Sequence, residues 1–568
     1  MKHFALRCLA GAMAAIALPA ATAGPAQLPP ATPGTLVGTC EDLPARLASL
    51  PATVITSGTT VPAGTLIVGG QPVAEHCRVT GRVNDRVSSV DGKAYAISFE
   101  MRLPKAWNGR FFHQGNGGID GAVVTANATF GGGPLTSALL QGFAVLSSDA
   151  GHDNAKVGGP AFGFDPQARL DYGYQAVSTL TPLAKQAIAA AYGKGPDRSY
   201  FGGCSNGGRH TLIAAARHAQ DYDGFLAGAP GYRLPLAALA NIWGAQRYAT
   251  VATGDPATAA GLETAFTAAE RKTVADAVLA RCDASDGATD GMVQSTRACQ
   301  KRFDLRRDVP TCPGARDGSC LTQAQKDAIG PIFKGATTSD GKPFYASFPY
   351  DGGLSGSGIA SWEFNAPLTR DSGAVGAIFK VPPSTLALTD GPAFSLGLDI
   401  DATLAELYAT DATYTESSMS FMTPPDAGQL NDVRDRGGKL LVYHGVSDPI
   451  FSMHDTEAWY RGVVRESKGA PRFVRLYRVP GMGHCSGGPA ADQADFITPL
   501  VNWVEYGQAP ASIVATARGP GNPGGVNADV PADWAPNRSR PLCPFPGVAK
   551  YKGSGDVELA SSWACRDE

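Results

Sequence analysis

The stretch RSYFGGCSNGGRHTLIAAARHA, residues 198–219, combines a short apolar run, a glycine-rich turn and an alanine-rich helical pattern. This order predicts a strand, a tight turn and a helix. The central GCSNG, residues 203–207, fits the pattern G-x-S-x-G, which marks a nucleophile elbow when it joins a strand to a helix. From this motif alone, a glycine-rich turn that happens to contain a serine is an equally good interpretation.

Strand-like and helix-like segments alternate on both sides of this stretch. Before it come two strand-like runs, GRFFHQGNGG (109–118) and GFAVLSSDAGHD (142–153), and a helix-like run, LTPLAKQAIAAAYG (180–193). Further strand signals appear in GGKLLVYHGVSDPIF (437–451) and RFVRLYRVPGMGHC (472–485). The alternation predicts an α/β protein built on a parallel sheet.

Residues 231–432 lack this alternation and contain alanine-rich helical pieces with Gly, Ser and Pro loops. We therefore expect an α/β-hydrolase fold whose first part spans 24–230, a large inserted lid domain at 231–432, and a second part at 433–568. The tail after residue 510 is rich in Gly and Pro and is expected to wrap around the core.

The chain is long enough to bury a large core, with 568 residues of which 43% are hydrophobic. Its formal net charge is only -3, without long Lys or Arg runs, which argues against a nucleic-acid or anionic-membrane partner. A small, neutral or modestly charged substrate and a monomeric protein are expected.

The N-terminus has the pattern of a signal peptide, MKHFALRCLAGAMAAIALPAATAG. It has a basic start, a short apolar middle and small residues before an expected cleavage after residue 23. A membrane anchor is the alternative, but the apolar run is shorter than the roughly 20 residues of a spanning helix. We expect a secreted or periplasmic protein, with no membrane attachment after cleavage.

Ten cysteines remain after the leader, an even number that favours five disulfides in an oxidising compartment. Close spacing pairs eight of them locally and leaves Cys204 and Cys485 as a distant pair. The expected bridges are Cys40–Cys77, Cys282–Cys299, Cys312–Cys320, Cys543–Cys565 and Cys204–Cys485. Zinc is the competing use of cysteines, but CxxC and HxxxH spacings are absent from the sequence.

Two loops later in the chain supply partners for Ser205. An α/β-hydrolase carries its serine, acid and histidine in that order, and Asp448 and His484 each follow a strand-like run. His484 would take the proton of Ser205 as general base, while Asp448 would orient the imidazole and stabilise its charge.

Other residues of the same types compete for these roles. His113 and His152 precede the serine and are expected to be hydrogen-bonded or site-lining histidines. Asp435 and Asp455 are rivals for the acid and are expected at the surface. Cys204 could itself be a nucleophile, which would need a reduced thiol in an exported chain.

An oxyanion needs backbone N–H donors near the serine. The first expected donor is Asn206, at the start of the helix, and the second is Gly117 or Gly118 in HQGNGGIDG. A plain turn is the alternative interpretation of the glycine loop.

These residues together resemble the tannase and feruloyl esterase family of α/β-hydrolases. The family is marked by a Cys-Ser pair, an Asp and a His-Cys pair, with a disulfide between the two cysteines. Here these are Cys204-Ser205, Asp448 and His484-Cys485. GNGG, SSDAGHD, GCSNGGR, GGKLLVYHGVSDP and GMGHC occur in the family's order, so the resemblance covers most of the mature chain.

The resemblance also implies a structural calcium ion in the lid, at CDASDGATDGMVQSTRAC (282–299). Carboxylates and backbone carbonyls are suitable calcium ligands. The expected ligands are the carboxylates of Asp283, Asp286 and Asp290 and the backbone carbonyls of Ala288 and Met292. A pair of Asp-Gly turns within the disulfide loop is the alternative.

Members of the family cleave esters of aromatic acids such as gallate and hydroxycinnamate, and one bacterial branch cleaves mono(2-hydroxyethyl) terephthalate. HGVSDPIFS is similar to that branch, which implies that His444 and Phe451 line the substrate pocket. In the lid, TYTESSMSFMT (413–423) does not match the arginine and phenylalanine with which that branch holds the terephthalate carboxylate.

The leading hypothesis is an exported serine esterase that hydrolyses esters of hydroxycinnamic, gallic, benzoic or terephthalic acids through an acyl-enzyme. The alternatives are a thioesterase or peptidase on the same fold, or a catalytically silent secreted binding protein.

Overall fold

The computed structural model describes Met1, residues 27–133 and residues 135–568. Apart from Met1, the expected signal peptide at 1–23 lies outside the described residues.

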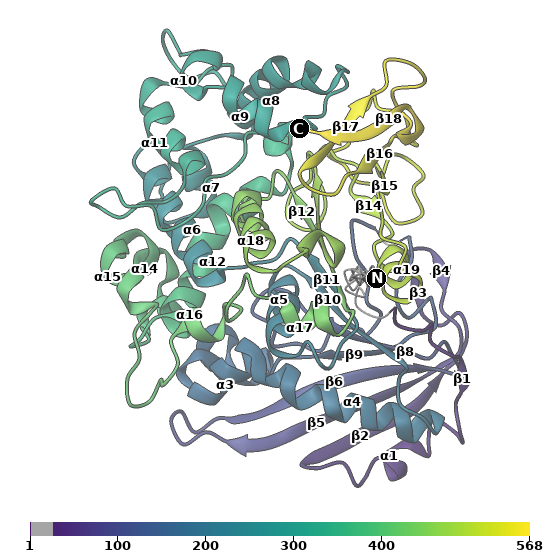
Figure 1. Cartoon of the computed structure of the whole chain (residues 1–568). Coiled ribbons are helices and arrows are strands. Elements are labelled where there is room, and N and C mark those ends of the chain that lie inside the picture. The colour runs from purple at the N-terminus through teal and green to yellow at the C-terminus, as the bar shows by residue number, and fades with distance from the viewer. Residues whose placement is uncertain (2–26, 134) are drawn as a thin grey trace.

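A nine-stranded mixed sheet forms the centre of the molecule (Figure 1), with the strand order β13-β12-β11-β10-β8-β9-β6-β5-β2. The strands from β13 to β9 in this order are parallel, and β6, β5 and β2 continue the sheet antiparallel. Their bounds are β2 (Thr53–Val61), β5 (His76–Val87), β6 (Ala94–Pro104), β8 (Arg110–Gly115), β9 (Ala144–Ser148), β10 (Arg198–Cys204), β11 (Gly224–Gly228), β12 (Lys439–Gly445) and β13 (Val474–Val479).

Neighbouring residues of a strand point to opposite faces of the sheet. Both faces of the parallel part are buried, so its strands contribute to two core clusters. In β12, Leu440 and Val442 belong to one core cluster, whereas Leu441 and Tyr443 belong to the other. Residues of α4 (Ala176–Tyr192), α5 (Asn206–Arg217) and α18 (Met453–Glu466) lie in the first cluster, and those of α19 (Ile497–Tyr506) lie in the second.

The chain between β11 and β12 forms a helical layer above the carboxyl ends of the parallel strands, on the left and upper side of Figure 1. Threonine caps start two of its helices: Thr267 with Glu270 and Thr322 with Gln325 form reciprocal capping boxes. The main helices are α6 (Leu234–Ala249), α7 (Ala259–Glu263), α8 (Ala268–Cys282), α9 (Thr296–Arg302), α11 (Gln323–Lys334), α12 (Ala366–Gly373), α14 (Gly391–Gly397), α15 (Ile400–Glu406) and α17 (Asn431–Asp435).

The C-terminal tail forms two small antiparallel sheets. One contains β14 (Gln493–Ala494), β15 (Ile513–Thr516) and β16 (Ser539–Leu542), and the other contains β17 (Gly547–Tyr551) and β18 (Trp563–Asp567). In Figure 1 this yellow segment lies beside α8 and α9, and Lys550 donates a hydrogen bond to the carbonyl of Ser285 in the lid. The tail thus joins the lid to the sheet.

The α/β-hydrolase fold class is confirmed, but the sheet is mixed rather than wholly parallel. The first strand-like run expected from the sequence was residues 109–118, and the antiparallel strands β2 and β5 lie before it. Their outer positions are half exposed, so they lack the continuous apolar runs that identified the inner strands.

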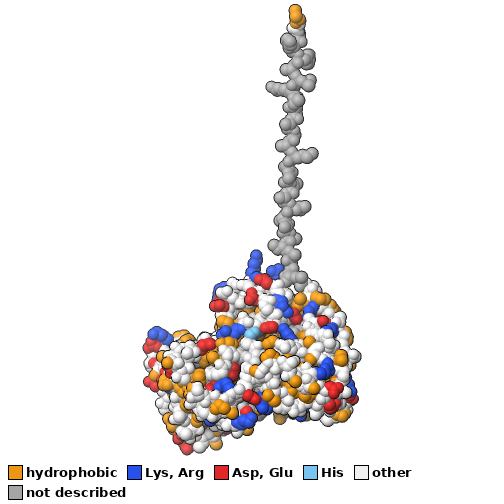
Figure 2. All heavy atoms as spheres, turned by 90° about the horizontal axis from the view of Figure 1, so that it is seen from below, with side chains coloured by type: hydrophobic (Ala, Val, Ile, Leu, Met, Phe, Trp, Pro, Cys, Tyr) orange, Lys and Arg blue, Asp and Glu red, His pale blue; other side chains and the backbone are white. Residues whose placement is uncertain are grey.

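Positive and negative side chains are interspersed on the face shown in Figure 2. Within the described part of the chain, no helix combines the length and apolar character that membrane crossing requires.

Candidate active site

Ser205 occupies a sharp turn between β10 and α5, with φ of 65° and ψ of -126°. This positive φ is unusual for a residue with a side chain, and it is the strained backbone of a nucleophile elbow. Gly203 and Gly207 permit the turn, since a Cβ at either position would lie within 2.5 Å of the carbonyl oxygen of Gly115. The glycines of the motif are therefore needed for close backbone packing.

His484 and Asp448 lie next to Ser205, because β10, β12 and β13 are parallel and end at the same edge of the sheet. Nε2 of His484 is 2.7 Å from Oγ of Ser205, and its Nδ1 is 2.7 Å from Oδ2 of Asp448. The structure thus brings the three residues expected from the sequence into one hydrogen-bonded chain.

Asp448 is fully buried and accepts four hydrogen bonds. Its Oδ1 accepts the backbone N–H groups of Ile450 and Phe451, and its Oδ2 accepts from His484 and His444. Burial by itself would raise the pKa of this carboxyl, but the charge of His484 and the hydrogen bonds from both histidines hold it well below its ordinary value. Asp448 is therefore suited to stay ionised and orient His484.

His444 is completely buried behind Asp448 and does not line the cavity beside Ser205. Its Nε2 is 3.1 Å from Oδ2 of Asp448 and 3.0 Å from the carbonyl oxygen of Phe451, and its Nδ1 is 2.9 Å from Oγ1 of Thr456. Because both neighbours of Nε2 are acceptors, Nε2 carries the proton. Of the two expected pocket residues, Phe451 lines the cavity, and His444 holds the acid.

The expected oxyanion donors surround Ser205. Asn206 is the first residue of α5, and a Cβ on Gly117 would be 3.8 Å from Cβ of Ser205. Gly118 lines the same cavity as Ser205, and its carbonyl accepts a hydrogen bond from the Tyr172 hydroxyl.

A buried polar network behind the elbow was not predicted from the sequence. Asp120 accepts a hydrogen bond of 2.5 Å from the Asn206 side chain, whose oxygen accepts from Arg209 at 2.6 Å. Arg209 also donates to the carbonyls of Tyr172 and Gly173. Burial raises the pKa of Asp120 to about 8, although Arg209 and Asn206 oppose this. The network ties the glycine loop to the start of α5. Asp120 lies in NGGIDG, and Asn206 and Arg209 lie in NGGRH, but nothing in the spacing of the two stretches signals contact.

The structure contains the same five disulfides that the sequence led us to expect. They join Cys40 to Cys77, Cys204 to Cys485, Cys282 to Cys299, Cys312 to Cys320 and Cys543 to Cys565. Cys204 and Cys485 have Cα atoms 6.1 Å apart and adjoin Ser205 and His484. Their bond connects the loop after β10 to the loop after β13, and it leaves Cys204 without a thiol.

One cavity is lined by Ser205 and another by His484. The Ser205 pocket, lined by Ser205, Asn206, Gly118, Phe451 and lid residues, has a volume of about 20 Å³. The His484 pocket, lined by His484, Trp362 and several glycines, has a volume of about 220 Å³.

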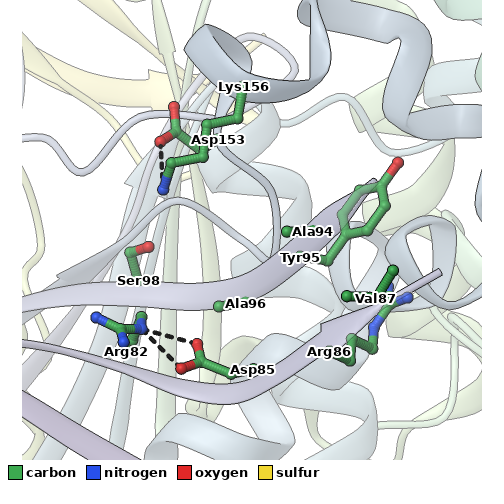
Figure 3. Close-up of a pocket in the computed structure, with 10 residues that line it drawn as sticks. All are labelled: Arg82, Asp85, Arg86, Val87, Ala94, Tyr95, Ala96, Ser98, Asp153 and Lys156. Carbon is green, nitrogen blue, oxygen red and sulfur yellow. Dashed lines mark hydrogen bonds and ion pairs between the residues drawn. The ribbon is translucent and has the colours of Figure 1, made fainter. Parts of the chain in front are cut away.

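A larger cavity of about 560 Å³ lies elsewhere, between β5, β6 and the turn around Asp153 (Figure 3). Its charges are paired, as Arg82 with Asp85 and Lys156 with Asp153.

The other histidines and aspartates considered for the base and the acid lie outside the Ser205 pocket. Nδ1 of His113 is 2.8 Å from the Tyr222 hydroxyl, whereas His152 stacks on Phe162 with no hydrogen-bond partner among the described residues. Asp435 is exposed as expected. The expectation for Asp455 was wrong: it is buried and forms an ion pair with Arg233, because α18 turns it inward.

The expected calcium loop lies between α8 and α9, with Asp283, Asp286 and Asp290 all buried. The pKa of Asp286 is raised to about 7 by burial and by the other two carboxylates. The three carboxylates accept backbone N–H groups of the loop, and Asp290 also pairs with Arg540. The residue types suit calcium, but no three His, Cys, Asp or Glu side chains in the described chain are grouped as a metal ion requires. Calcium binding stays a prediction.

The sheet order, the elbow after β10 and the helical insertion after β11 define an α/β-hydrolase. A model of the family "Tannase and feruloyl esterase" matches residues 77–566. The chain belongs to this family.

Known relatives agree with this assignment. The chain is 40% identical over 524 residues to mono(2-hydroxyethyl) terephthalate hydrolase of Piscinibacter sakaiensis, which covers 86% of this chain and 85% of the relative. It is 29% identical to a probable feruloyl esterase B-1 of Aspergillus fumigatus, with 82% of each chain covered. Among solved structures, feruloyl esterase B from Aspergillus oryzae has a TM-score of 0.72 at 24% identity, covering 93% of this chain and 99% of that one. At this identity the structural likeness supports the fold alone.

Proposed function

We propose that this protein is an exported serine esterase that hydrolyses esters of aromatic carboxylic acids through an acyl-enzyme. The observation that carries the proposal is the continuous hydrogen-bonded chain from Ser205 through His484 to Asp448 at the elbow. Membership of the tannase and feruloyl esterase family supports the same chemistry. Five disulfides are typical of a protein that works outside the cytosol.

In the first step Oγ of Ser205 attacks the ester carbonyl carbon while its proton passes to Nε2 of His484. The carbonyl becomes a tetrahedral oxyanion, which the N–H groups of Asn206 and of Gly117 or Gly118 stabilise. Asp448, held ionised by four hydrogen-bond donors, stabilises the imidazolium. The C–O bond to the alcohol then breaks, and the alcohol leaves with the proton from His484.

In the second step water attacks the acyl-Ser205 ester. His484 takes a proton from the water, the second tetrahedral oxyanion collapses, and Oγ of Ser205 leaves with that proton. The aromatic acid is released and the enzyme is restored. The alcohol and the water both need access to Nε2 of His484, and the His484 pocket provides a route on that side.

The acid part of the substrate is assigned to the Ser205 pocket. Leu234, Ile450 and Phe451 supply apolar walls next to the nucleophile and the expected oxyanion donors, as an aromatic ring requires. The names of two relatives, a terephthalate monoester hydrolase and a feruloyl esterase, also indicate aromatic acyl groups.

The test is ester hydrolysis by the wild-type protein and a Ser205→Ala variant. We expect Ser205-dependent hydrolysis of methyl ferulate, methyl gallate or mono(2-hydroxyethyl) terephthalate, with a preference over short alkyl esters. The alanine variant lacks the attacking oxygen, so it should lose at least about 10³-fold in kcat. Asp435→Asn, at an exposed ion pair, is a control that should retain activity.

Three results would contradict the proposal. Full activity of the Ser205→Ala variant would show that Ser205 is not the nucleophile. Faster turnover of amides or acyl-thioesters than of aromatic esters would indicate a peptidase or thioesterase. Binding of aromatic esters without hydrolysis would indicate a silent binding protein.

A further inference from the structure

We propose that the lid pair Arg370 and Asp371 makes the enzyme select acyl groups with a neutral phenolic hydroxyl over acyl groups with a second carboxylate. The inference rests on the proposed function and names the class of aromatic acid that the Ser205 pocket accepts.

Both residues lie on α12 and line the same cavity as Ser205, Asn206 and Gly118. The other walls are mainly apolar, so the two charged residues and Asn241 supply most of the polar contacts that a ring substituent could make. A few polar groups in an apolar pocket usually decide specificity.

The two charges neutralise each other. Nε and Nη2 of Arg370 donate to Oδ1 of Asp371 at 2.8 and 2.5 Å, and Nδ2 of Asn241 is 3.2 Å from Oδ2. The Asp371 side chain is 3% exposed and that of Arg370 is 25% exposed. Arg370 also lies over the Trp362 ring, 4.8 Å from its centroid. The pair is therefore held in place by both of its neighbours.

Each member retains unused hydrogen-bonding capacity. Oδ2 of Asp371 accepts only from Asn241, and Nη1 of Arg370 has no protein partner within the residues that the structure describes. The pair thus offers a carboxylate acceptor at Oδ2 of Asp371 and guanidinium N–H donors at Nη1 of Arg370, with no net charge.

A phenolic hydroxyl matches this arrangement, since it can donate to Asp371 and accept from Arg370. A carboxylate has acceptors only, and the repulsion from Asp371 offsets its attraction to Arg370. Placing a negative group beside the ligand in this way is a means of rejecting a charged competitor.

The pocket volume of about 20 Å³ holds roughly one water molecule. An aromatic acyl group therefore enters only when α12 or the facing side chains move outward. Arg370 and Asp371 are neighbours on α12, so their ion pair stays intact when this helix moves.

The experiment compares esters that differ only in the ring substituent. One pair is methyl 4-hydroxybenzoate and monomethyl terephthalate, and a second, longer pair is methyl 4-hydroxycinnamate and methyl 4-carboxycinnamate. The ratio of kcat/KM within a pair is measured on one preparation, so enzyme concentration and general damage cancel. The assay is run at pH 7, where the ring hydroxyl is neutral and the ring carboxylate is ionised, and it is repeated at pH 8 because burial raises the pKa of Asp371.

We expect the wild-type protein to favour the hydroxylated ester by roughly tenfold or more in at least one pair. Asp371→Asn leaves the Arg370 cation unopposed, and we expect this variant to shift the ratio toward the carboxylated ester by roughly tenfold. Arg370→Gln leaves the Asp371 carboxylate unopposed and should shift the ratio the opposite way. Asp435→Asn, which breaks an ion pair between adjacent residues at an exposed site on α17, should not change it.

The inference is overturned if the wild-type protein favours the carboxylated ester in both pairs, or if neither pocket variant changes the ratio. If Asp371→Asn does not fold, the shift expected for Arg370→Gln decides. Failure of the proposed function is a different result: no ester of either pair would be hydrolysed in a Ser205-dependent way.

Discussion

The serine at the elbow depends on its immediate neighbours. Ser205 has a positive φ, and the glycines at 203 and 207 let its loop approach the end of β8. Behind it, Arg209 is completely buried and donates to the Asn206 side chain and to two backbone carbonyls. The position of Ser205 therefore depends on a buried cation behind the elbow.

The variant Arg209→Met should lower the free energy of unfolding by about 3–5 kcal/mol, because it leaves buried acceptors unpaired. Chemical denaturation measures this. Arg434→Met, at an exposed ion pair on α17, should change stability by less than about 0.5 kcal/mol. Equal effects of the two variants would contradict the structural role of Arg209.

At the scale of elements, the site is assembled from loops that follow three parallel strands. The loop after β10 carries Ser205 and the loop after β13 carries His484, and the Cys204–Cys485 disulfide joins them across 281 residues of sequence. The bond restrains the distance between Oγ of Ser205 and Nε2 of His484.

Removing this bridge with Cys204→Ala and Cys485→Ala should lower kcat by about 10- to 100-fold, because small displacements of catalytic groups are costly. Steady-state kinetics measures the loss. The matched control is Cys312→Ala with Cys320→Ala, which removes a bridge across only 8 residues of the lid and should leave kcat unchanged. An undiminished kcat in the first variant would show that packing alone holds the two loops.

The loop between α8 and α9 allows a separate test of calcium binding. If Asp283, Asp286 and Asp290 bind calcium, saturation after chelation should stabilise the fold by about 2–3 kcal/mol and raise Tm. Asp286→Asn should lose this response, whereas Asp276→Asn, at an exposed ion pair on α8, should keep it. The same Tm with calcium as with chelator would exclude a structural calcium ion in this loop.

At the scale of the whole molecule, the packed interior contains histidines whose pKa is lowered by burial, among them His113, His152 and His210. Burial lowers the pKa of His152 to about 3 from an ordinary value of 6.5. Between these pH values the unfolded chain binds a proton that the folded protein does not. The free energy of unfolding therefore falls as the pH drops below about 6.5.

In the variant His152→Met, the loss of stability between pH 7 and pH 4 should be smaller than in the wild-type protein by about 3 kcal/mol. Urea unfolding at several pH values measures the free energy of unfolding of the wild-type protein and of the variant. Phe162→Leu, in the residue that stacks on His152, is the control, since it should lower stability by a similar amount at every pH. Equal slopes in the wild type and in His152→Met would contradict this assignment.

The sequence by itself determined the inner strands, the elbow, the order of Ser205, Asp448 and His484, and five pairs of cysteines. These are local signals: continuous apolar runs mark strands buried on both faces, and a turn that needs glycine shows its glycines. The edge strand β2 and its neighbour β5 were missed because their half-exposed residues do not form such runs.

Apart from the triad and the Cys204–Cys485 bridge, only the tertiary structure decided which side chains meet across long stretches of sequence. It buried Asp455 against Arg233 and brought the lid pair Arg370 and Asp371 to the pocket of Ser205. It also decided the role of His444, which lies behind Asp448 and not in the pocket. No periodic pattern records these contacts, because they depend on how α12 and α18 pack on the sheet and not on neighbours in sequence. The serine elbow is therefore encoded by neighbouring residues of the sequence, whereas the composition of the pocket beside Ser205 depends on packing between distant segments.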